Sequence, residues 1–271
     1  MDRLIKLNSG TAMPRFGLGL YTVTGKNVTQ IMQDAVVMGY RLFDTASAYK
    51  NEDEVGDAVR SCGVPRDELF ITTKVWNTAQ RIGDIEGAFM RSLERLQLDY
   101  VDLYLMHWPV AGCYPETWHA MEKIYRSGLA KAIGVCNFNE LELMHLLENS
   151  DIVPAVNQIE YHPLCNQEKL RNFCQSKGIV VQASAPLARG EYLNRHFLKQ
   201  MAEKYHRSTA QIGLRWLIQK DICVIPRSIQ IDRLLENSQI FDFELDETEM
   251  AVIDQMNEDL RVINVPVDIL N

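Results

Sequence analysis

The chain has 271 residues, 46% of them hydrophobic and 24% charged, which is typical of a globular protein that can bury a large core. Aspartate and glutamate number 36 against 28 lysines and arginines, and the net charge of −8 argues against broad, non-specific binding of nucleic acid. This balance still allows a small basic pocket for a phosphorylated ligand.

Apolar runs rich in β-branched residues recur along the chain, as is typical of parallel strands that are covered on both faces. The runs predict eight strands, over residues 15–21, 41–46, 69–76, 100–108, 131–138, 155–161, 179–185 and 222–226.

Helical patterns separate the predicted strands. In one of them Phe89 and Leu93 share an apolar face. Two helix starts carry a capping box, one at Asn139 and one at Asp246, each with a glutamate three residues later. The pattern is weakest over residues 189–207, which we expect to contain a loop as well as a helix.

Alternating strands and helices predict parallel strands joined by right-handed crossovers. Eight such units in 271 residues favour an α/β fold, a (β/α)8 TIM barrel, with residues 1–271 as a single domain. An open doubly wound sheet is the structural alternative. No Gly/Ser-rich linker, charge block or sequence repeat marks a second domain.

Four polar residues fall where predicted strands end, and this is the end at which a TIM barrel carries its catalytic groups. Asp44 closes the second strand, Tyr49 follows it five residues later, Lys74 is near the end of the third and His107 near the end of the fourth. Each alone has an ordinary structural explanation, such as capping, packing or snorkelling. Their joint placement on one face of one barrel favours shared chemistry.

These residue types suit carbonyl reduction, in which carbon takes a hydride and oxygen takes a proton. A free tyrosine has a pKa of about 10, and an adjacent ammonium lowers that pKa. We therefore assign Tyr49 as the general acid, Lys74 as the group that lowers its pKa, and Asp44 as the partner of Lys74. A neutral His107 can orient the carbonyl oxygen by donating a hydrogen bond.

The segment over residues 39–52, GYRLFDTASAYKNE, resembles the first signature of the aldo-keto reductase family. Further similar blocks follow in family order between about residues 15 and 257: TTKVWN, LDYVDLYLMHWP, GLAKAIGVCNF, VNQIEYHP and IPRS. The general pattern is similar to the bacterial reductases of diketogluconate and methylglyoxal type. The resemblance implies an eight-stranded barrel, a catalytic tetrad at Asp44, Tyr49, Lys74 and His107, and NADPH-dependent reduction of aldehydes or ketones.

No G-x-G-x-x-G motif lies between a strand and a helix, so a Rossmann site is not indicated. The resemblance implies instead an extended NADPH across the barrel mouth, with Asn137 and Gln158 on the nicotinamide carboxamide. Cys136 stands where the family usually has serine, and Ser184 stands where it usually has an aromatic residue that stacks on the nicotinamide. Leu187 belongs to the same expected cofactor-binding set.

The adenosine end of the cofactor would lie over residues 227–237. By the resemblance, Arg227, Ser228 and Arg233 match positions that meet the 2′-phosphate, and Asn237 matches an adenine contact. The family more often has lysine at Arg227, and arginine keeps the charge while offering bidentate phosphate binding. We therefore expect NADPH rather than NADH. The alternative is two solvated surface arginines that flank a helix start.

Three aromatic residues, Tyr21, Trp76 and Trp108, follow or end strands at the predicted mouth and can wall an apolar substrate pocket. Packing at the barrel rim is the alternative explanation. The loop over residues 110–116 and the tail after Asn257 are short. Since both regions shape substrate choice in the family, we expect an open site for several small carbonyl compounds, and a monomer.

The six cysteines include no C-x-x-C pair, so no metal site is predicted, and they fit a reduced cytoplasmic protein. The N-terminal residues lack the apolar segment of a signal peptide, and no run is as long as a membrane span. We therefore expect no membrane partner.

Two other functions stay open. A regulatory barrel of the same family that holds nucleotide with little turnover is favoured by Cys136 and Ser184 and opposed by the intact tetrad. A barrel hydrolase with paired carboxylates would draw on the acidic run Glu52, Asp53 and Glu54. That run is better interpreted as the first turn of a helix, where acidic side chains complement the helix dipole.

Overall fold

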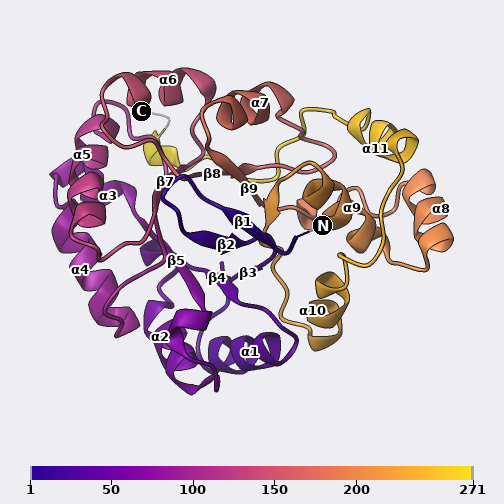
Figure 1. Ribbon diagram of the computed structural model, residues 1–271, viewed down its shortest axis with the longest axis horizontal. Coiled ribbons are helices and arrows are strands. Elements are labelled where there is room, and N and C mark those ends of the chain that lie inside the picture. Colours follow the sequence, from indigo (N-terminus) through magenta and orange to yellow (C-terminus); the bar gives the residue numbers. More distant parts are fainter. Residues whose placement is uncertain (1, 270–271) are drawn as a thin grey trace.

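A computed structural model describes residues 2–269 and contains an eight-stranded parallel sheet whose strands follow one another in chain order (Figure 1). Each strand lies inside one of the eight predicted apolar runs. The strands are β3 (Leu18–Gly19), β4 (Leu42–Asp44), β5 (Phe70–Val75), β6 (Leu103–Met106), β7 (Ile133–Cys136), β8 (Val156–Glu160), β9 (Val180–Ser184) and β10 (Cys223–Val224).

The sheet closes into a barrel between its first and last strands. A parallel bridge joins Phe16 to Val224, and the N–H of Gly17 donates to the carbonyl of Val224 at 2.9 Å. At this seam a Cβ on Gly19 would lie 3.0 Å from the carbonyl oxygen of Ile225. On the other side of the first strand, a Cβ on Gly17 would lie 2.8 Å from the carbonyl oxygen of Leu42 in β4. Consecutive strand order and closure exclude the open doubly wound sheet, whose strand order reverses at a switch point.

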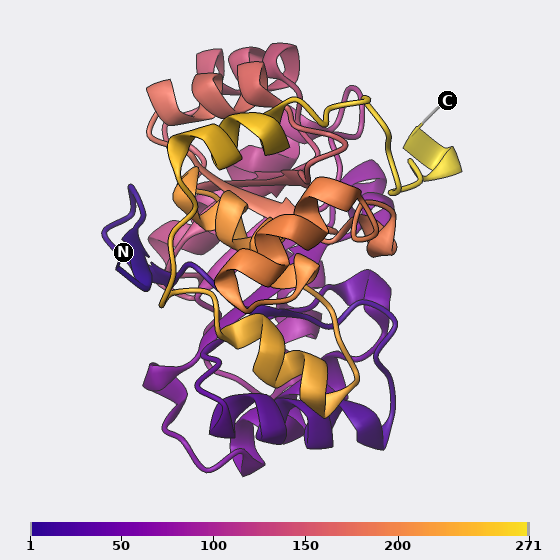
Figure 2. The same ribbon diagram turned by 90° about the vertical axis from the view of Figure 1, so that its right-hand side faces the viewer.

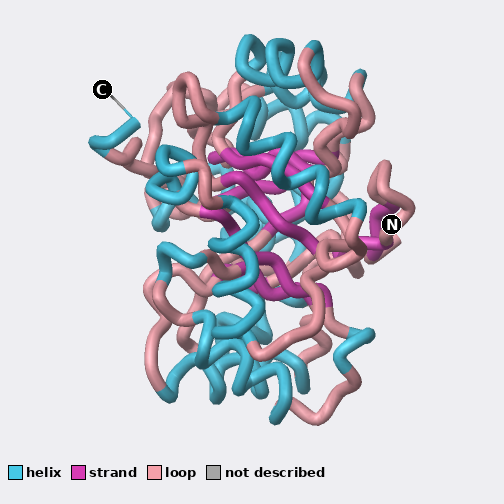
Figure 3. Tube along the Cα trace, turned by 90° about the vertical axis from the view of Figure 1, so that its left-hand side faces the viewer, coloured by secondary structure: helices cyan, strands magenta, loops and turns pink. Residues whose placement is uncertain are grey.

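Helices form a ring outside the strands, as Figures 1 and 3 show from two directions. They are α1 (Lys26–Val37), α2 (Glu52–Ser61), α3 (Asn77–Ile82), α4 (Ile85–Leu96), α5 (Tyr114–Arg126), α6 (Glu140–Glu148), α7 (Glu168–Ser176), α8 (His196–Tyr205), α9 (Thr209–Gln219), α10 (Ile231–Ser238) and α11 (Glu247–Asp254). Within the described residues, none of these helices is both long enough and apolar enough to cross a membrane.

Local sequence explains where several helices begin and which face they bury. The capping boxes expected at Asn139 and Asp246 are both formed, at the starts of α6 and α11. Phe89 and Leu93 of α4 are buried, as their helical spacing predicts. The weakly patterned stretch contains a 3₁₀ turn, η3 (Ala188–Gly190), a loop and then α8, so the mixed prediction there is confirmed.

An antiparallel hairpin that the sequence pattern did not predict covers one end of the barrel. Its strands, β1 (Leu4–Lys6) and β2 (Ala12–Pro14), cross the centre of Figure 1. Leu7 and Met13 from this hairpin pack with Leu103 and Leu105 from inside the barrel, so the hairpin closes the end at which the parallel strands begin. Figure 2 shows the N-terminus on one side of the barrel and the C-terminal segment on the other.

Candidate active site

The side chain of Lys74 lies at the centre of a buried polar cluster inside the barrel. Its Nζ is 2.5 Å from Asp44 Oδ1, 2.9 Å from the Thr45 carbonyl oxygen and 3.2 Å from Tyr49 Oη. Lys74 is 0% exposed, and a buried charge of this kind is tolerated only when it is paired and hydrogen-bonded. β4 and β5 are neighbours, so they bring Asp44 and Lys74 together as the sequence predicted.

The loop after β4 holds Tyr49 over this cluster. Tyr49 ends a short 3₁₀ helix, η1 (Ser47–Tyr49), which is tied to β5 because Ser47 Oγ donates to the Lys74 carbonyl at 2.9 Å. Asn51 is fully buried behind it: its Oδ1 accepts from Thr45 at 2.5 Å and its Nδ2 donates to the Leu20 carbonyl at 3.0 Å. These bonds fix a loop that carries a reactive hydroxyl.

The pKa of Tyr49 corrects part of the electrostatic expectation. Burial raises the pKa of the phenol to about 12, although the ammonium of Lys74 pulls it down. Lys74 therefore acts in the expected direction, but desolvation outweighs it and Tyr49 is a protonated phenol at neutral pH. For Lys74, burial favours the neutral amine, yet Asp44 and Tyr49 together raise its pKa, so the ammonium stays charged.

His107 faces the Tyr49 ring across the mouth, with ring centroids 5.6 Å apart. Burial, together with the nearby charge of Lys74, lowers the pKa of His107 well below its usual value, so the imidazole is neutral. Its Nδ1 is buried without a hydrogen-bond partner in the described chain. A neutral imidazole is the form that can donate one hydrogen bond to an incoming oxygen atom.

The ends of β7, β8 and β9 bring three further predicted residues to the same region. Asn137 has φ +62° and donates from Nδ2 to the His107 carbonyl at 3.0 Å. Gln158 donates from Nε2 to Asp44 Oδ2 at 2.8 Å and to Gln182 Oε1 at 2.7 Å. The Ser184 hydroxyl is buried and has no partner in the described chain.

Cys136 lies inside the barrel below these residues and is buried. Burial raises the pKa of its thiol, while Lys74 lowers it less strongly, so the sulfur is a neutral thiol. A neutral, buried thiol offers only a weak hydrogen-bond donor.

The second group of predicted cofactor residues lies at α10, after the last barrel strand. Arg227 and Arg233 are exposed, and neither guanidinium pairs with a carboxylate of the described residues, whereas Ser228 and Asn237 are buried. Tyr40 Oη donates to the Leu234 carbonyl at 2.8 Å and ties α10 to the barrel. Two unpaired cations in a protein with a net charge of −8 make this a local anion-attracting surface.

A row of rings crosses the mouth above the polar cluster. Tyr21 is exposed and packs edge-on against Tyr49 at 5.1 Å, and Trp76 packs edge-on against His107 at 5.0 Å. Trp108 follows His107 directly, and its carbonyl accepts from Gln80 Nε2 at 3.0 Å. Tyr21 and Trp76 therefore flank Tyr49 and His107, as a wall of an apolar pocket would require.

Comparison with known proteins identifies the family over nearly the whole chain. Residues 12–258 match the model of the aldo/keto reductase family. The chain belongs to the aldo/keto reductase family.

This aldo/keto reductase is 47% identical to a glyoxal reductase of Bacillus subtilis, over 98% of this chain and 97% of that protein. It is 40% identical to a methylglyoxal reductase of Escherichia coli, over 96% of this chain and 95% of that protein. A solved aldo-keto reductase of Bombyx mori in complex with NADP superposes with a TM-score of 0.91 at 38% identity, covering 97% of this chain and 95% of that one.

The predictions of family, TIM-barrel fold and enzyme class are thereby confirmed, and the protein is an oxidoreductase that reduces carbonyl groups with a nicotinamide cofactor.

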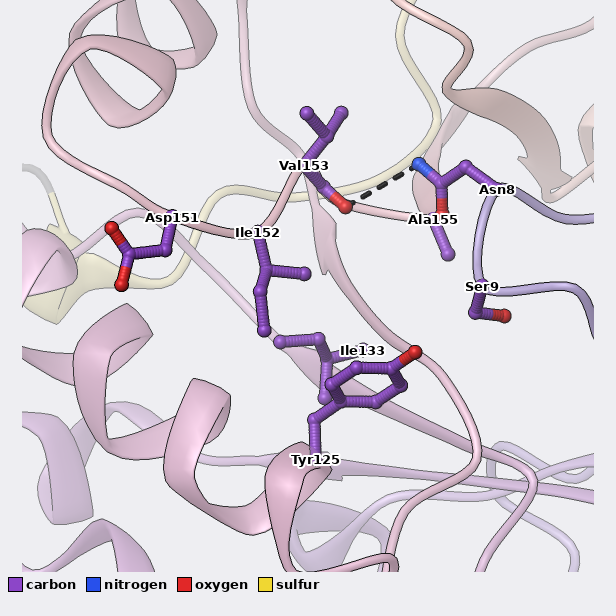
Figure 4. Close-up of a pocket in the computed structure, with 8 residues that line it drawn as sticks. All are labelled: Asn8, Ser9, Tyr125, Ile133, Asp151, Ile152, Val153 and Ala155. Carbon is purple, nitrogen blue, oxygen red and sulfur yellow. Dashed lines mark hydrogen bonds between the residues drawn. The ribbon is translucent and has the colours of Figure 1, made fainter.

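A cavity of about 340 Å³ lies at the other end of this aldo/keto reductase (Figure 4). It sits among the β1–β2 turn, the last turn of α5 and the starts of β7 and β8, far along the barrel from the ends that carry Tyr49 and Lys74. Two of its polar side chains are already engaged: Asn8 donates to the Val153 and Pro154 carbonyls, and Asp151 pairs with Arg126. The cavity lacks the convergent free polar groups of a reaction site.

Sequence reasoning missed several residues that hold the site together. Asn51 was visible in the first family block, and only its burial identifies its function as a loop anchor. Gln182 accepts from the same Gln158 amide group as Asp44, and it was missed because it lies within an apolar run. The acidic run was correctly interpreted as a first helical turn, and Glu52 there also pairs with Arg95 at 2.6 Å.

Proposed function

We propose that this aldo/keto reductase uses NADPH to reduce small aldehydes and α-dicarbonyl compounds, with Tyr49 as the proton donor. The observation that carries the proposal is the position of Tyr49 Oη, 3.2 Å from the buried ammonium of Lys74. The phenol oxygen accepts from Lys74, so its own O–H is free to point into the mouth. The relatives that are named for glyoxal and methylglyoxal support the small dicarbonyl class.

Carbonyl reduction needs a hydride on carbon and a proton on oxygen. A bound nicotinamide cofactor would supply the hydride, and Tyr49 Oη would give its proton to the carbonyl oxygen. His107 donates a hydrogen bond that orients this oxygen beside Tyr49. Lys74 stabilises the phenolate that remains, and Asp44 keeps Lys74 charged and in place.

The residues present fit a nicotinamide cofactor. Gln158 Oε1 and Asn137 Oδ1 accept no hydrogen bond from the described chain, so both are free to accept from the two N–H groups of a carboxamide. The buried Ser184 hydroxyl is a free donor in the same region, and Leu187 is half-buried beside it. The unpaired Arg227 and Arg233, with Ser228, suit the 2′-phosphate, and Asn237 suits the adenine.

The test is NADPH consumption with methylglyoxal and with a generic aldehyde, for the wild type and for Tyr49→Phe. We expect kcat of the variant to fall by about 10²–10⁴, the usual contribution of a general acid, while NADPH binding followed by fluorescence stays unchanged. Full activity in Tyr49→Phe would remove the proton-donor role. Tight NADPH binding by the wild type without turnover on a carbonyl panel would favour the regulatory alternative.

We further propose that residues 1–271 act as one domain in a cytoplasmic monomer with Tyr21, Trp76 and Trp108 around the substrate. The tetrad is brought together within one barrel, and the six cysteines are free thiols, which suits a reducing compartment. Light scattering of the purified protein tests the monomer directly, since a dimer doubles the measured mass.

A further inference from the structure

Residues 262 and 263, near the end of the described chain, are bound to the mouth end of β8 through one buried carboxylate. Glu160 Oε1 accepts from the backbone N–H of Val262 at 2.6 Å, and Oε2 accepts from the N–H of Ile263 at 3.2 Å. His162 Nε2 lies 2.9 Å from the same Oε1. Glu160 is 2% exposed and His162 is 0% exposed, whereas Val262 and Ile263 are half-buried.

Glu160 holds the segment, and the segment in turn stabilises the charge of Glu160. Burial favours the neutral acid, but the bonds from His162 and from the two backbone amides outweigh burial and lower the pKa of Glu160. The carboxylate is therefore charged at neutral pH, and hydrogen bonds to a buried charge are stronger than neutral ones. Release of Val262 and Ile263 would leave that charge with too few partners, which is unfavourable.

The position of Glu160 brings this fastening to the reaction site. Gln158 points inward to Asp44, and Glu160 is two residues further along β8, on the same face of the strand, roughly 7 Å nearer the mouth. In the sheet register Glu160 lies beside Ser184 of β9, one of the residues proposed to face the nicotinamide. The backbone at Val262 and Ile263 therefore passes over the rim beside Gln158 and Ser184.

Neighbouring bonds show that the whole segment follows the loop after β8. The N–H groups of Glu258 and Leu260 both donate to the Leu164 carbonyl, at 3.1 and 3.0 Å, and Arg261 donates to Gln167 at 2.9 Å. Leu164 is buried as well and accepts from Glu258 and Leu260, whereas the carboxylate of Glu160 accepts from Val262 and Ile263. Of these acceptors only Glu160 is charged, and hydrogen bonds to a charged group are stronger than neutral ones.

We propose that Glu160 is a positioning residue that holds residues 258–263 at the barrel mouth, where this segment forms one wall of the site for the carbonyl substrate. The proposal rests on the proposed function and adds to it the residue that fixes this wall. Glu160 acts through the backbone of the segment and takes no part in proton transfer.

Two variants cut the contact from opposite sides. Glu160→Gln removes the charge and turns an N–H group toward a backbone donor. Ile263→Pro removes the amide that donates to Glu160 Oε2 and leaves the Arg261–Val262 bond open to trypsin. Val265→Pro is the matched control, because Val265 is exposed and its N–H donates to no other described residue. The first readout is tryptic cleavage after Arg261 in the full chain, followed by mass spectrometry. The second is KM and kcat for methylglyoxal with saturating NADPH.

We expect both variants to be cleaved after Arg261 about tenfold faster than wild type and to raise KM about fivefold or more, with kcat within about twofold. The double variant should be no worse than either single one, since both break the same contact. The control should match wild type in both readouts.

Unchanged cleavage in both variants would show that Glu160 does not hold the segment. Faster cleavage with an unchanged KM would show that the segment does not form a wall of the substrate site. A wild-type protein that does not consume NADPH would overturn the proposed function and the wall with it. Tryptic cleavage would still decide whether Glu160 anchors the segment.

Discussion

At the scale of single residues, the site depends on opposing electrostatic effects. Burial pushes the pKa of Tyr49 up to about 12, and the ammonium 3.2 Å away pulls it down. The sequence predicted the neighbours of Tyr49 correctly, because parallel strands end at the same edge and bring the residues there together. The net direction of the pKa was not predictable, because it depends on how deeply the loop is buried.

The pH dependence follows from these pKa values. Reduction needs a protonated Tyr49 and a neutral His107, and neither group titrates between about pH 7 and pH 9. We expect kcat for carbonyl reduction to be flat over that range. Alcohol oxidation needs the phenolate, so its rate should rise about tenfold per pH unit below the pKa of Tyr49. A steep fall of the reduction rate within this range would contradict the assignment.

Lys74 also supports the fold through Asp44. Lys74→Met leaves the Asp44 carboxylate buried with Gln158 as its remaining side-chain donor, and we expect the free energy of unfolding to fall by about 3–5 kcal/mol. Urea unfolding measures this loss. Adding Asp44→Asn should restore part of the stability without restoring turnover. Equal stability of Lys74→Met and wild type would show that the buried charge is compensated elsewhere.

At the scale of elements, two separate segments of the chain serve the two ends of the proposed cofactor. The loops after β4 to β9 gather around Tyr49, while α10 and the residues before it carry the unpaired arginines. The sequence predicted both groups by resemblance. It did not reveal the contact of Glu160 with Val262 and Ile263, because this contact uses backbone amides about a hundred residues away, which leave no pattern in side-chain types.

Selectivity for the phosphorylated cofactor should reside in α10. Arg233→Ala removes one unpaired guanidinium, and we expect KM for NADPH to rise about tenfold, since a hydrogen bond to a charged group contributes about 1.5–3 kcal/mol. KM for NADH should stay within about twofold and is the internal control. If both cofactors weaken equally, Arg233 supports the fold of α10 rather than the phosphate.

At the scale of the whole molecule, two glycines let the first barrel strand lie close to both of its neighbours. The apolar runs predicted eight strands because each is buried on both faces, and all eight were confirmed. The β1–β2 hairpin escaped prediction because its strands have three residues each and expose part of their side chains, so they lack a continuous apolar run.

Alanine substitutions at these glycines test how closely the first strand packs against β4 and against the residues after β10. In Gly17→Ala the new Cβ would lie 2.8 Å from the Leu42 carbonyl oxygen, and we expect a loss of about 1–3 kcal/mol in the free energy of unfolding. Gly19→Ala is the milder comparison, because its Cβ would lie 3.0 Å from the Ile225 carbonyl oxygen. Urea midpoints should rank wild type, Gly19→Ala and Gly17→Ala in that order. The reverse ranking would show that the contact between Gly17 and β4 relaxes easily.

The hairpin and the C-terminal segment lie at opposite ends of the barrel (Figure 2). A fusion partner attached ahead of the hairpin therefore sits a full strand length away from Tyr49, and immobilisation on a sensor surface through that end leaves the mouth open to solvent. Attachment through the C-terminal segment would instead pull on the backbone that Glu160 binds. The choice of tag thus becomes a kinetic variable in this enzyme, and assays should compare both orientations before substrate preferences are ranked.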